Sequence, residues 1–448
     1  MTILFAESAL THDGWRRNVR IGIAAGLVSE ILVDAEPQPG DERHAVIVAG
    51  MGNLHSHAFQ RAMAGLAEMR GPSDDSFWSW RNVMYKFALS MTPEHVEAVA
   101  AQLYVEMLEA GFTRVGEFHY LHHDRNGEHY SDIAELASRI AGASAEAGIG
   151  LTLLPVFYAH AGFGGLAPAE GQRRFINSPD SFSRLMDRCR DVLSPLAGAR
   201  LGIAPHSLRA VTPEELEEIV SIAGFGPIHI HVAEQTKEVE DCIAWSGARP
   251  VQWLMDNAPV DERWCLIHAT HMDEAEIDGM ARSGAIAGLC PITEANLGDG
   301  TFAARRFIEH GGRYGIGSDS NIDISLAHEL RQLEYSQRIL HRSRNVIADA
   351  GQSTGQRMFA DALQGGALAL GGTDRINTGE RADLVALDTG AVPFLQEAQV
   401  IDQWIFASGV RVDTVWTAGE KQVIAGRHRK RDAIRQRFQT SMRELLAS

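Results

Sequence analysis

The sequence predicts an α/β protein built on a (β/α)8 barrel of the TIM type, with a small β-sandwich domain formed by both chain ends. Short apolar, β-rich runs alternate with longer amphipathic stretches, eight such runs can be counted, and polar residues gather where the runs end. The chain has 448 residues, whereas a typical domain has roughly 100–200. A barrel with a smaller appended domain is therefore expected.

The eight predicted strands are distributed over most of the chain. In order they are residues 44–55, 113–120, 151–158, 200–207, 227–234, 264–270, 285–291 and 314–320. Predicted helices lie between them, and residues 92–112 and 212–225 both open with Thr-Pro-Glu, which is typical of a helix cap followed by proline in the first turn. Eight strands with helical connections close most simply into a barrel. We assign residues 48–374 to this barrel.

The two ends of the chain have a different pattern. Residues 1–47 and 375–425 contain short alternating segments separated by glycine, which predict antiparallel strands. Because these segments flank the barrel, we expect them to pack together as one small β-sandwich domain. Residues 426–448 have helical periodicity and predict a C-terminal helix on the surface.

Charge and composition limit the classes of function. The chain carries 41 basic and 58 acidic residues, a net charge of −17 that argues against binding to nucleic acid or to anionic membranes. No apolar run approaches the roughly 20 residues needed to span a bilayer, and the N-terminal residues have no basic leader. The four cysteines are far apart, without a Cys-x-x-Cys pair. These features predict a cytoplasmic protein that acts on a small molecule, with a homodimer as the default assembly.

Histidines and one acid follow the predicted strands at their C-terminal ends, the face where barrel enzymes build their sites. His55 and His57 end the first strand, and a two-residue step places both side chains on one face. His231, His268 and Asp319 end the fifth, sixth and eighth strands. Imidazole and carboxylate are ligands that suit zinc or iron(II). The sequence therefore predicts a divalent metal centre.

The ordered motifs Leu-His-Ser-His, His-Val-Ala-Glu and Ser-Asp-Ser, together with His268, resemble the amidohydrolase superfamily. The resemblance extends to residues 379–388, which are similar to the strand by which such enzymes re-enter their small β domain. It implies that the metal ligands are His55, His57, His231 and Asp319. The fourth strand lacks the lysine that bridges two metals in many relatives, so one metal ion is expected, either zinc or iron(II).

The same resemblance implies that Glu234 and His268 work on water and substrate. A bound divalent metal can lower the pKa of water from about 15.7 to about 7, which supplies hydroxide at neutral pH. Asp319 and His268 would position this water, and Glu234 would carry a proton to the departing nitrogen. In the alternative interpretation, Glu234 only orients His231.

Residues 53–65, Asn-Leu-His-Ser-His-Ala-Phe-Gln-Arg-Ala-Met-Ala-Gly, narrow the resemblance to members that hydrolyse the formimino group of a glutamate derivative to a formyl group. These enzymes release ammonia in histidine breakdown. The resemblance then implies substrate contacts from Gln60, Arg81, Tyr120, His206 and Arg209. The chemistry of the side chains agrees with these contacts, because such a substrate is a dicarboxylate and guanidinium groups bind carboxylates.

Two further segments carry expectations of their own. Arg81 follows an aromatic run in a long insertion, where we expect a lid. The patch containing His119, His122, His123 and His129 follows no ligand spacing, and we expect loop residues near the pocket.

Two alternatives remain open. The same metal centre serves deaminases of cyclic amidines such as guanine, and triazine-type hydrolases, although a purine pocket has little use for two arginines. A barrel that has lost its chemistry and serves as a scaffold is the other alternative, and the presence of every predicted ligand argues against it.

Overall fold

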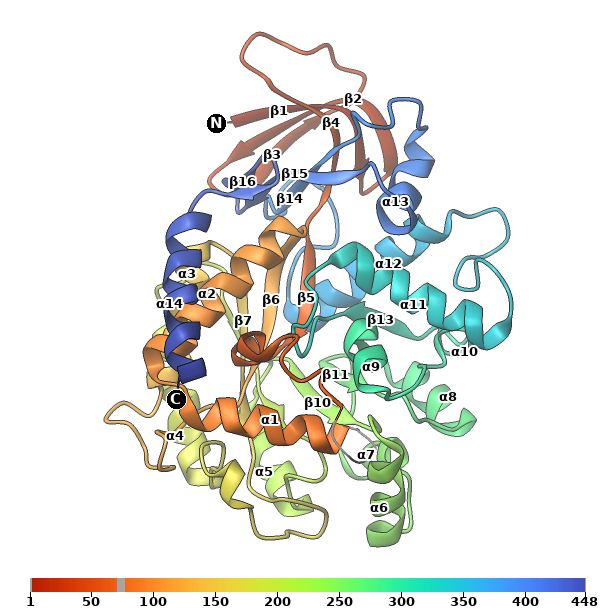
Figure 1. The fold of residues 1–448 in the computed structure, drawn as a ribbon. Helices are drawn as coiled ribbons and strands as arrows, with labels where there is room; N and C mark the ends of the chain where they lie inside the picture. The colour runs from red at the N-terminus through yellow and green to blue at the C-terminus, as the bar shows by residue number, and fades with distance from the viewer. Residues whose placement is uncertain (1, 71–76, 448) are drawn as a thin grey trace.

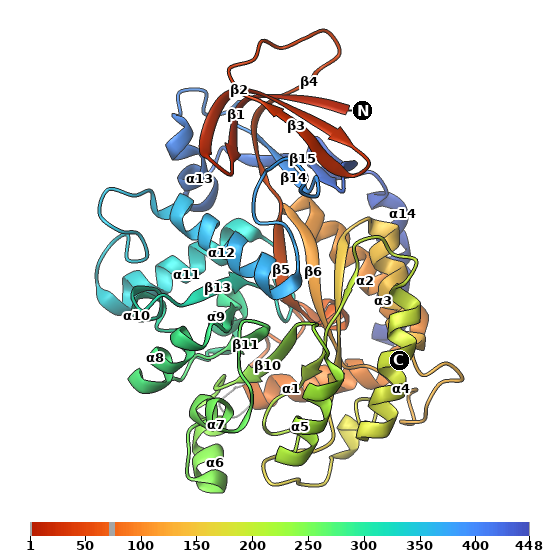
Figure 2. The same ribbon diagram turned by 180° about the vertical axis from the view of Figure 1, so that it is seen from behind.

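A computed structural model of the chain describes residues 2–70 and 77–447. A small β domain lies at the top of the molecule, and a larger body of strands surrounded by helices lies below it (Figures 1 and 2). The N-terminus belongs to the small domain, and the C-terminal helix runs down the side of the larger body (Figure 1).

The larger body contains parallel strands in two hydrogen-bonded groups. The first group is β5 (Met51–Ser56), β6 (Phe112–His119), β7 (Gly150–Phe157), β8 (Arg200–Leu201) and β9 (Ala204–Pro205), and the second is β10 (Ile228–Val232), β11 (Trp264–His268), β12 (Ile286–Leu289) and β13 (Arg313–Ile316). Isolated parallel bridges join the groups at both edges, between Ser56 and Asp319 and between Ile203 and Ile228. The strands therefore follow one another around a ring, as the predicted barrel requires.

Helices cover the outside of this ring (Figure 1). They are α2 (Pro93–Glu109), α3 (Glu135–Ala147), α4 (Pro179–Leu193), α5 (Pro213–Ile222), α6 (Thr236–Ser246), α7 (Pro250–Asn257), α8 (Glu274–Ser283), α9 (Pro291–Leu297), α10 (Ala304–Glu309), α11 (Leu326–His341) and α12 (Thr354–Leu370). The side chains of Thr92 and Thr212 cap α2 and α5 by accepting from the N–H groups of His95 and Glu215. Both helices predicted from Thr-Pro-Glu are confirmed.

Shorter elements lie on the face where the barrel strands end. They are η1 (Ala58–Met63), α1 (Phe77–Ser90) and η2 (Glu170–Gln172). The insertion that precedes Arg81 lies partly in residues 71–76, outside the described residues, so the predicted lid is described only from α1 onward.

Strands from both chain ends form one eight-stranded, sandwich-like sheet in the order β17-β16-β15-β14-β4-β1-β2-β3. Their bounds are β1 (Thr2–Thr11), β2 (Gly14–Ala24), β3 (Leu27–Leu32), β4 (Glu42–Ala49), β14 (Leu384–Asp388), β15 (Arg411–Thr417), β16 (Glu420–Ile424) and β17 (Arg427–His428). The pairing is antiparallel as predicted, except that β1 and β4 are parallel. α13 (Glu397–Phe406) packs beside this sheet. α14 (Arg431–Ala447) lies within residues 426–448, where a C-terminal helix was predicted.

The predicted first barrel strand, residues 44–55, is in fact two strands. β4 pairs with β1 and β14 in the small sheet, and β5 enters the barrel directly after Gly50. A Cβ atom on Gly50 would lie 2.2 Å from Cγ2 of Thr113, so only glycine fits at this crossing. The prediction was wrong here because an unbroken apolar run carries no mark of the point where a strand changes sheets.

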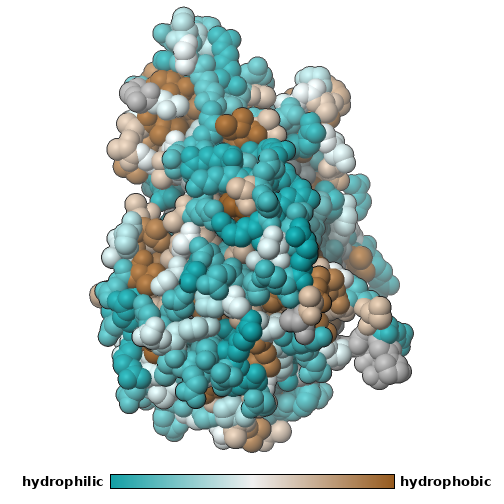
Figure 3. Space-filling model, turned by 60° about the vertical axis from the view of Figure 1, so that its left-hand side comes forward, coloured by the Kyte–Doolittle hydropathy of each residue, from teal (hydrophilic) through white to brown (hydrophobic). Residues whose placement is uncertain are grey.

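The surface of the protein is mixed in character. The face shown in Figure 3 is mainly hydrophilic, and its hydrophobic residues form separate patches. Among the described residues, no helix combines the length and the apolar character that a membrane span requires.

Candidate active site

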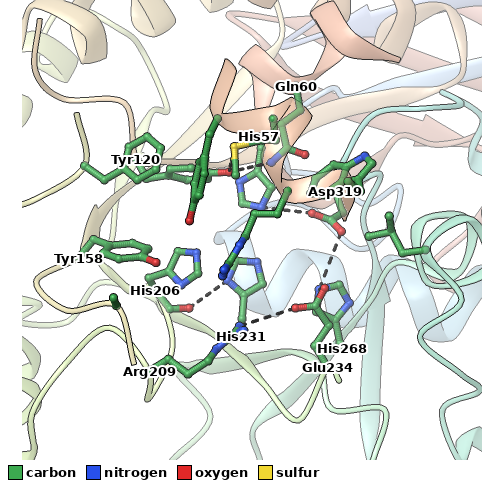
Figure 4. A pocket seen from close by; sticks show the side chains of 17 residues that line it. His57, Gln60, Tyr120, Tyr158, His206, Arg209, His231, Glu234, His268 and Asp319 are labelled. Carbon is green, nitrogen blue, oxygen red and sulfur yellow. Dashed lines mark hydrogen bonds and ion pairs between the residues drawn. The ribbon is translucent and has the colours of Figure 1, made fainter. Parts of the chain in front are cut away.

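Three histidines and one aspartate meet at the C-terminal ends of the barrel strands. Figure 4 shows His57, His231 and Asp319 of this set. His55 and His57 come from the end of β5, His231 from β10, and Asp319 from the turn after β13. All four side chains are buried, and one candidate ligand atom of each lies within 4.8 Å of the others. The structure thus brings together the four residues that the sequence predicted as metal ligands.

The nitrogen atoms in this cluster are closely spaced. Nε2 of His55 lies 3.1 Å from Nε2 of His231. Oδ1 of Asp319 lies 3.2 Å from Nε2 of His57 and 3.4 Å from Nε2 of His55. Donor atoms of the kinds that zinc and iron(II) prefer therefore converge on one small volume.

Backbone carbonyls fix the orientation of two of these rings. Nδ1 of His57 lies 2.9 Å from the carbonyl oxygen of Phe118, and Nδ1 of His231 lies 2.9 Å from that of His206. A carbonyl only accepts, so each Nδ1 carries a proton, and Nε2 of each ring is the nitrogen that faces the cluster. The arrangement fits a divalent cation. Because the partner of Nδ1 of His231 is a backbone carbonyl, the geometry argues against the alternative in which Glu234 orients this ring.

The charges of the cluster suit a cation as well. Burial lowers the pKa of His55 to about 3 and that of His231 well below its ordinary value, so both rings are neutral at pH 7. Burial acts to raise the pKa of Asp319, but its contacts with His55 and His57 hold that pKa well below the ordinary value. One negative charge and the neutral imidazoles of His55 and His231 therefore face the centre.

His268 and Glu234 stand beside the cluster. Nε2 of His268 lies 3.8 Å from Oδ2 of Asp319 and 3.8 Å from Oε1 of Glu234. Burial alone would lower the pKa of His268, but the Glu234 carboxylate and a hydrogen bond to Glu294 raise it to about 10. Burial raises the pKa of Glu234. A histidine and an acid with shifted pKa values thus border the same space, as acid–base chemistry requires.

Several of these side chains sit on strained backbone. Positive φ angles occur at Ala233, His268, Ala269 and Asp319, with values of 52°, 67°, 48° and 44°. None of these residues is glycine, and the left-handed region is costly for them. Four of the twelve non-glycine residues with positive φ among the described residues therefore lie at strand ends around the cluster.

A pocket opens onto this cluster. Its lining includes all five residues predicted to contact substrate, which are Gln60, Arg81, Tyr120, His206 and Arg209, together with His57, His231, Glu234, His268 and Asp319. The sequence analysis missed the residues that complete the wall, which are Trp80, Met84, Tyr85, Tyr158, Ala161, Phe175 and Leu297. Tyr158 follows β7 as Tyr120 follows β6, so strand-end position alone could have identified it.

Two predicted substrate residues have unused hydrogen-bonding capacity. Gln60 donates from Nε2 to the Tyr120 hydroxyl at 2.7 Å, while its buried Oε1 has no partner among the described residues. Arg209 places Nη2 3.8 Å from carboxylate oxygens of both Glu234 and Glu238, while its buried Nε has no partner there either. Glu238 also accepts from the N–H groups of Ala233 and Glu234 at 3.1 and 3.2 Å.

The other histidine patch is not part of the pocket wall. His119 is the last residue of β6, and His119, His122 and His123 are buried. Nε2 of His122 donates to the carbonyl of Val156 at 2.9 Å, and Nε2 of His123 donates to that of Ile176 at 2.6 Å. The expectation of loop residues was therefore wrong for His119, which is in a strand, whereas His122 and His123 lie in the loop after β6 and bond to buried backbone carbonyls.

The barrel and its cluster define a metal-binding barrel enzyme, and comparison with known proteins identifies its family. The model of the amidohydrolase family matches residues 46–421, and the chain belongs to this family. A second family model, described as the N-terminal domain of formimidoylglutamate deiminase HutF, matches residues 1–45.

Two individual relatives are similar over the full chain, and a third is similar over most of it. Formimidoylglutamate deiminase from Pseudomonas aeruginosa is 51% identical over 455 residues, covering 100% of both chains. The crystal structure of an amidohydrolase from Brucella melitensis superposes with a TM-score of 0.98 at 59% identity, covering 100% of both chains. A 5-methylthioadenosine/S-adenosylhomocysteine deaminase from Natronomonas pharaonis is 27% identical, covering 82% of this chain and 80% of the relative.

Proposed function

We propose that the chain is a formimidoylglutamate deiminase, which hydrolyses N-formimino-L-glutamate to N-formyl-L-glutamate and ammonia in histidine degradation. One observation carries the proposal. Two arginines line the same pocket as the candidate metal ligands, His268 and the buried Glu234. The relative from Pseudomonas aeruginosa, whose name states this activity, supports it.

The cofactor of this reaction is one divalent metal ion, zinc or iron(II). His55, His57, His231 and Asp319 would hold it, and the close approach of Nε2 of His55 to Nε2 of His231 fits such an ion. When bound, the cation would lower the pKa of a water molecule and supply hydroxide at neutral pH.

The two carboxylate oxygens of Asp319 have different neighbours. Oδ1 contacts His55 and His57 within the cluster, whereas Oδ2 faces His268. Oδ2 would therefore accept a proton from the attacking water, while Nε2 of His268 holds that water in place. Glu234 would deliver a proton to the departing nitrogen, a task for which its raised pKa is suited.

The remaining pocket residues would bind the substrate. Arg81 and Arg209 match its two carboxylates, because guanidinium forks pair with carboxylates in a bidentate manner. The unpartnered Oε1 of Gln60 would accept an N–H of the formimino group. Tyr120 and His206 complete the polar wall.

Assembly and location are further parts of the proposal. The enzyme would act in the cytoplasm as a homodimer. Residues 48–374 would form the catalytic domain, residues 1–47 and 375–425 the small domain, and residues 426–448 the helix docked beside them.

The test is ammonia release by protein reconstituted with zinc or iron(II). We expect turnover of N-formimino-L-glutamate, and Glu234→Gln should reduce kcat by at least about 100-fold, in line with the loss of a general acid. Robust turnover of guanine or a triazine, with none of the formimino compound, would favour the other enzyme class. A protein that holds no metal after reconstitution would favour a scaffold.

A further inference from the structure

Two tyrosines that the sequence analysis missed contact the same amide nitrogen of one glutamine. Gln172, on η2, is buried. Its Nε2 lies 2.8 Å from the hydroxyl of Tyr158 and 3.3 Å from the hydroxyl of Tyr85. Tyr85 comes from α1 and Tyr158 follows β7, so one amide links two separate walls of the pocket.

The orientation of this amide is determined by the backbone. The N–H of Ala169 lies 2.7 Å from the other end of the Gln172 side chain. A backbone N–H can only donate, so its partner must be Oε1, and the NH2 group must face the tyrosines. Both phenolic oxygens are therefore acceptors of hydrogen bonds from Gln172.

Each hydroxyl must then direct its own proton elsewhere. A phenol has one O–H, and that proton cannot point at the NH2 group that already donates to its oxygen. Within residues 2–70 and 77–447, no protein acceptor receives the O–H of Tyr85 or Tyr158. Burial raises the pKa of Tyr158 well above its ordinary value, so the proton stays in place at neutral pH.

These two O–H groups belong to the same pocket as the arginines. Tyr85, Tyr158, Arg81 and Arg209 all line it. The Arg81 guanidinium lies 5.6 Å from the centre of the Tyr85 ring. Tyr158 stands beside His206, with ring centres 4.5 Å apart, and its hydroxyl points into the space that Arg209 borders (Figure 4).

We propose that Tyr85 and Tyr158 donate their hydroxyl protons to one carboxylate of the substrate, and that Gln172 is the positioning residue that sets the direction of both donors. This inference rests on the proposed function. A carboxylate accepts at every lone pair, so it satisfies both O–H groups and the nearby guanidinium. The NH2 group of a carboxamide at the same place would face the O–H groups of the tyrosines, so that donors would meet donors. Such a mismatch strongly disfavours a substrate. Tyr85, Tyr158 and Gln172 together therefore favour a dicarboxylate substrate over its amide.

The first test measures KM and kcat for N-formimino-L-glutamate in metal-loaded Tyr85→Phe and Tyr158→Phe. We expect KM to rise about tenfold or more in each variant, the effect of losing a hydrogen bond to a charged group, while kcat changes little. Calorimetric binding of N-formyl-L-glutamate should weaken in parallel, which gives a readout other than turnover. Tyr335→Phe, on the outer surface of α11, is the matched control and should behave as the wild type.

The second test separates Gln172 from the tyrosines. Gln172→Glu replaces the NH2 donor with an acceptor, so both O–H groups should turn toward it, and KM should rise as in the tyrosine variants although both tyrosines remain. The same substitution in the Tyr85→Phe/Tyr158→Phe protein should add little. A further rise of the same size in that background would show simple charge repulsion and would overturn the positioning role.

The third test uses the two monoamides of the substrate. The wild type should discriminate against one of them, either the side-chain or the main-chain amide, and the double tyrosine variant should lose that discrimination. If the wild type turns over N-formimino-L-glutamate but both Tyr→Phe variants keep its KM, the tyrosine proposal is wrong. A wild type inactive on this compound would instead refute the proposed function.

Discussion

Nδ1 of His268 lies 3.3 Å from Oε1 of Glu294, a buried carboxylate on α9. The same oxygen accepts from the backbone N–H of Cys290 at 2.9 Å, so the position of the carboxylate is fixed. With its Nδ1 proton directed at Glu294, the ring turns Nε2 toward Asp319 and Glu234. Glu294 thus determines which nitrogen of His268 faces the substrate.

Replacing Glu294 should therefore affect catalysis more than substrate binding. We expect Glu294→Ala to lower kcat by about 10–100-fold, the usual effect of losing a partner that orients an active-site histidine, with KM nearly unchanged. Steady-state kinetics at equal metal content check this. Glu309→Gln, at an exposed position on α10, is the control. An unchanged kcat in Glu294→Ala would contradict the role.

Arg209 should contribute mainly to substrate affinity. We expect Arg209→Lys, which keeps the charge but loses the fork, to raise KM for N-formimino-L-glutamate by at least about tenfold. Lysine is the better test than alanine, because alanine would leave the buried Glu234 and Glu238 without their counter-charge. Arg305→Lys, on the surface, should leave KM unchanged. A normal KM in Arg209→Lys would show that no bidentate contact forms there.

Metal removal should lower the stability of the fold. The four buried side chains of the cluster fit one cation, and a tightly bound ion would stabilise the protein by about 4 kcal/mol at a concentration 1,000-fold above its Kd. Thermal unfolding with and without a chelator measures this, and readdition of zinc should restore Tm. His231→Ala should show little response to the chelator. An equal response in that variant would place the metal elsewhere.

Buried neutral histidines should make the protein sensitive to acid. Burial lowers the pKa of His119 to about 3, whereas an unfolded histidine titrates near about 6.5. The unfolded state therefore takes up this proton first, so the stabilisation is complete above about pH 6.5 and is lost as pH falls, by about 1.4 kcal/mol per pH unit for one proton.

Urea unfolding between pH 7 and pH 4 tests this expectation. His119→Asn, which keeps a polar group near Nδ1, should show a shallower fall in the free energy of unfolding than the wild type. The readout is the slope and not the absolute stability, so a general loss from the substitution does not obscure it. Equal slopes would mean that His119 does not titrate on unfolding.

The set of candidate metal ligands could be predicted because each residue has a recognisable position in the local sequence. His55 and His57 alternate on one strand, and His231, His268 and Asp319 follow apolar runs, so barrel topology alone brings them together. Each position could be assigned without knowing any long-range contact.

Other parts of the site gave no such signal. Gln172 contacts Tyr85, which is 87 positions away in the sequence. Glu294 contacts His268 and belongs to a short helix that follows the next strand. An isolated glutamine or glutamate in a loop or helix is usually a solvated residue, and only tertiary packing makes these two different. The division of residues 44–55 into β4 and β5 was hidden for a similar reason, because it depends on pairing with β14, far away in sequence.

This last pairing has a consequence for how the protein is made. β4 leads through Gly50 directly into the strand that bears His55 and His57, and it is held between β1 and β14. On the ribosome, residues 384–388 emerge long after every side chain of the pocket has been synthesised. A nascent chain that stops short of them has a complete active-site sequence but an unpaired edge on β4. β4, which leads into the strand that carries His55, therefore gains β14 as its second neighbour only after every residue of the pocket has been made.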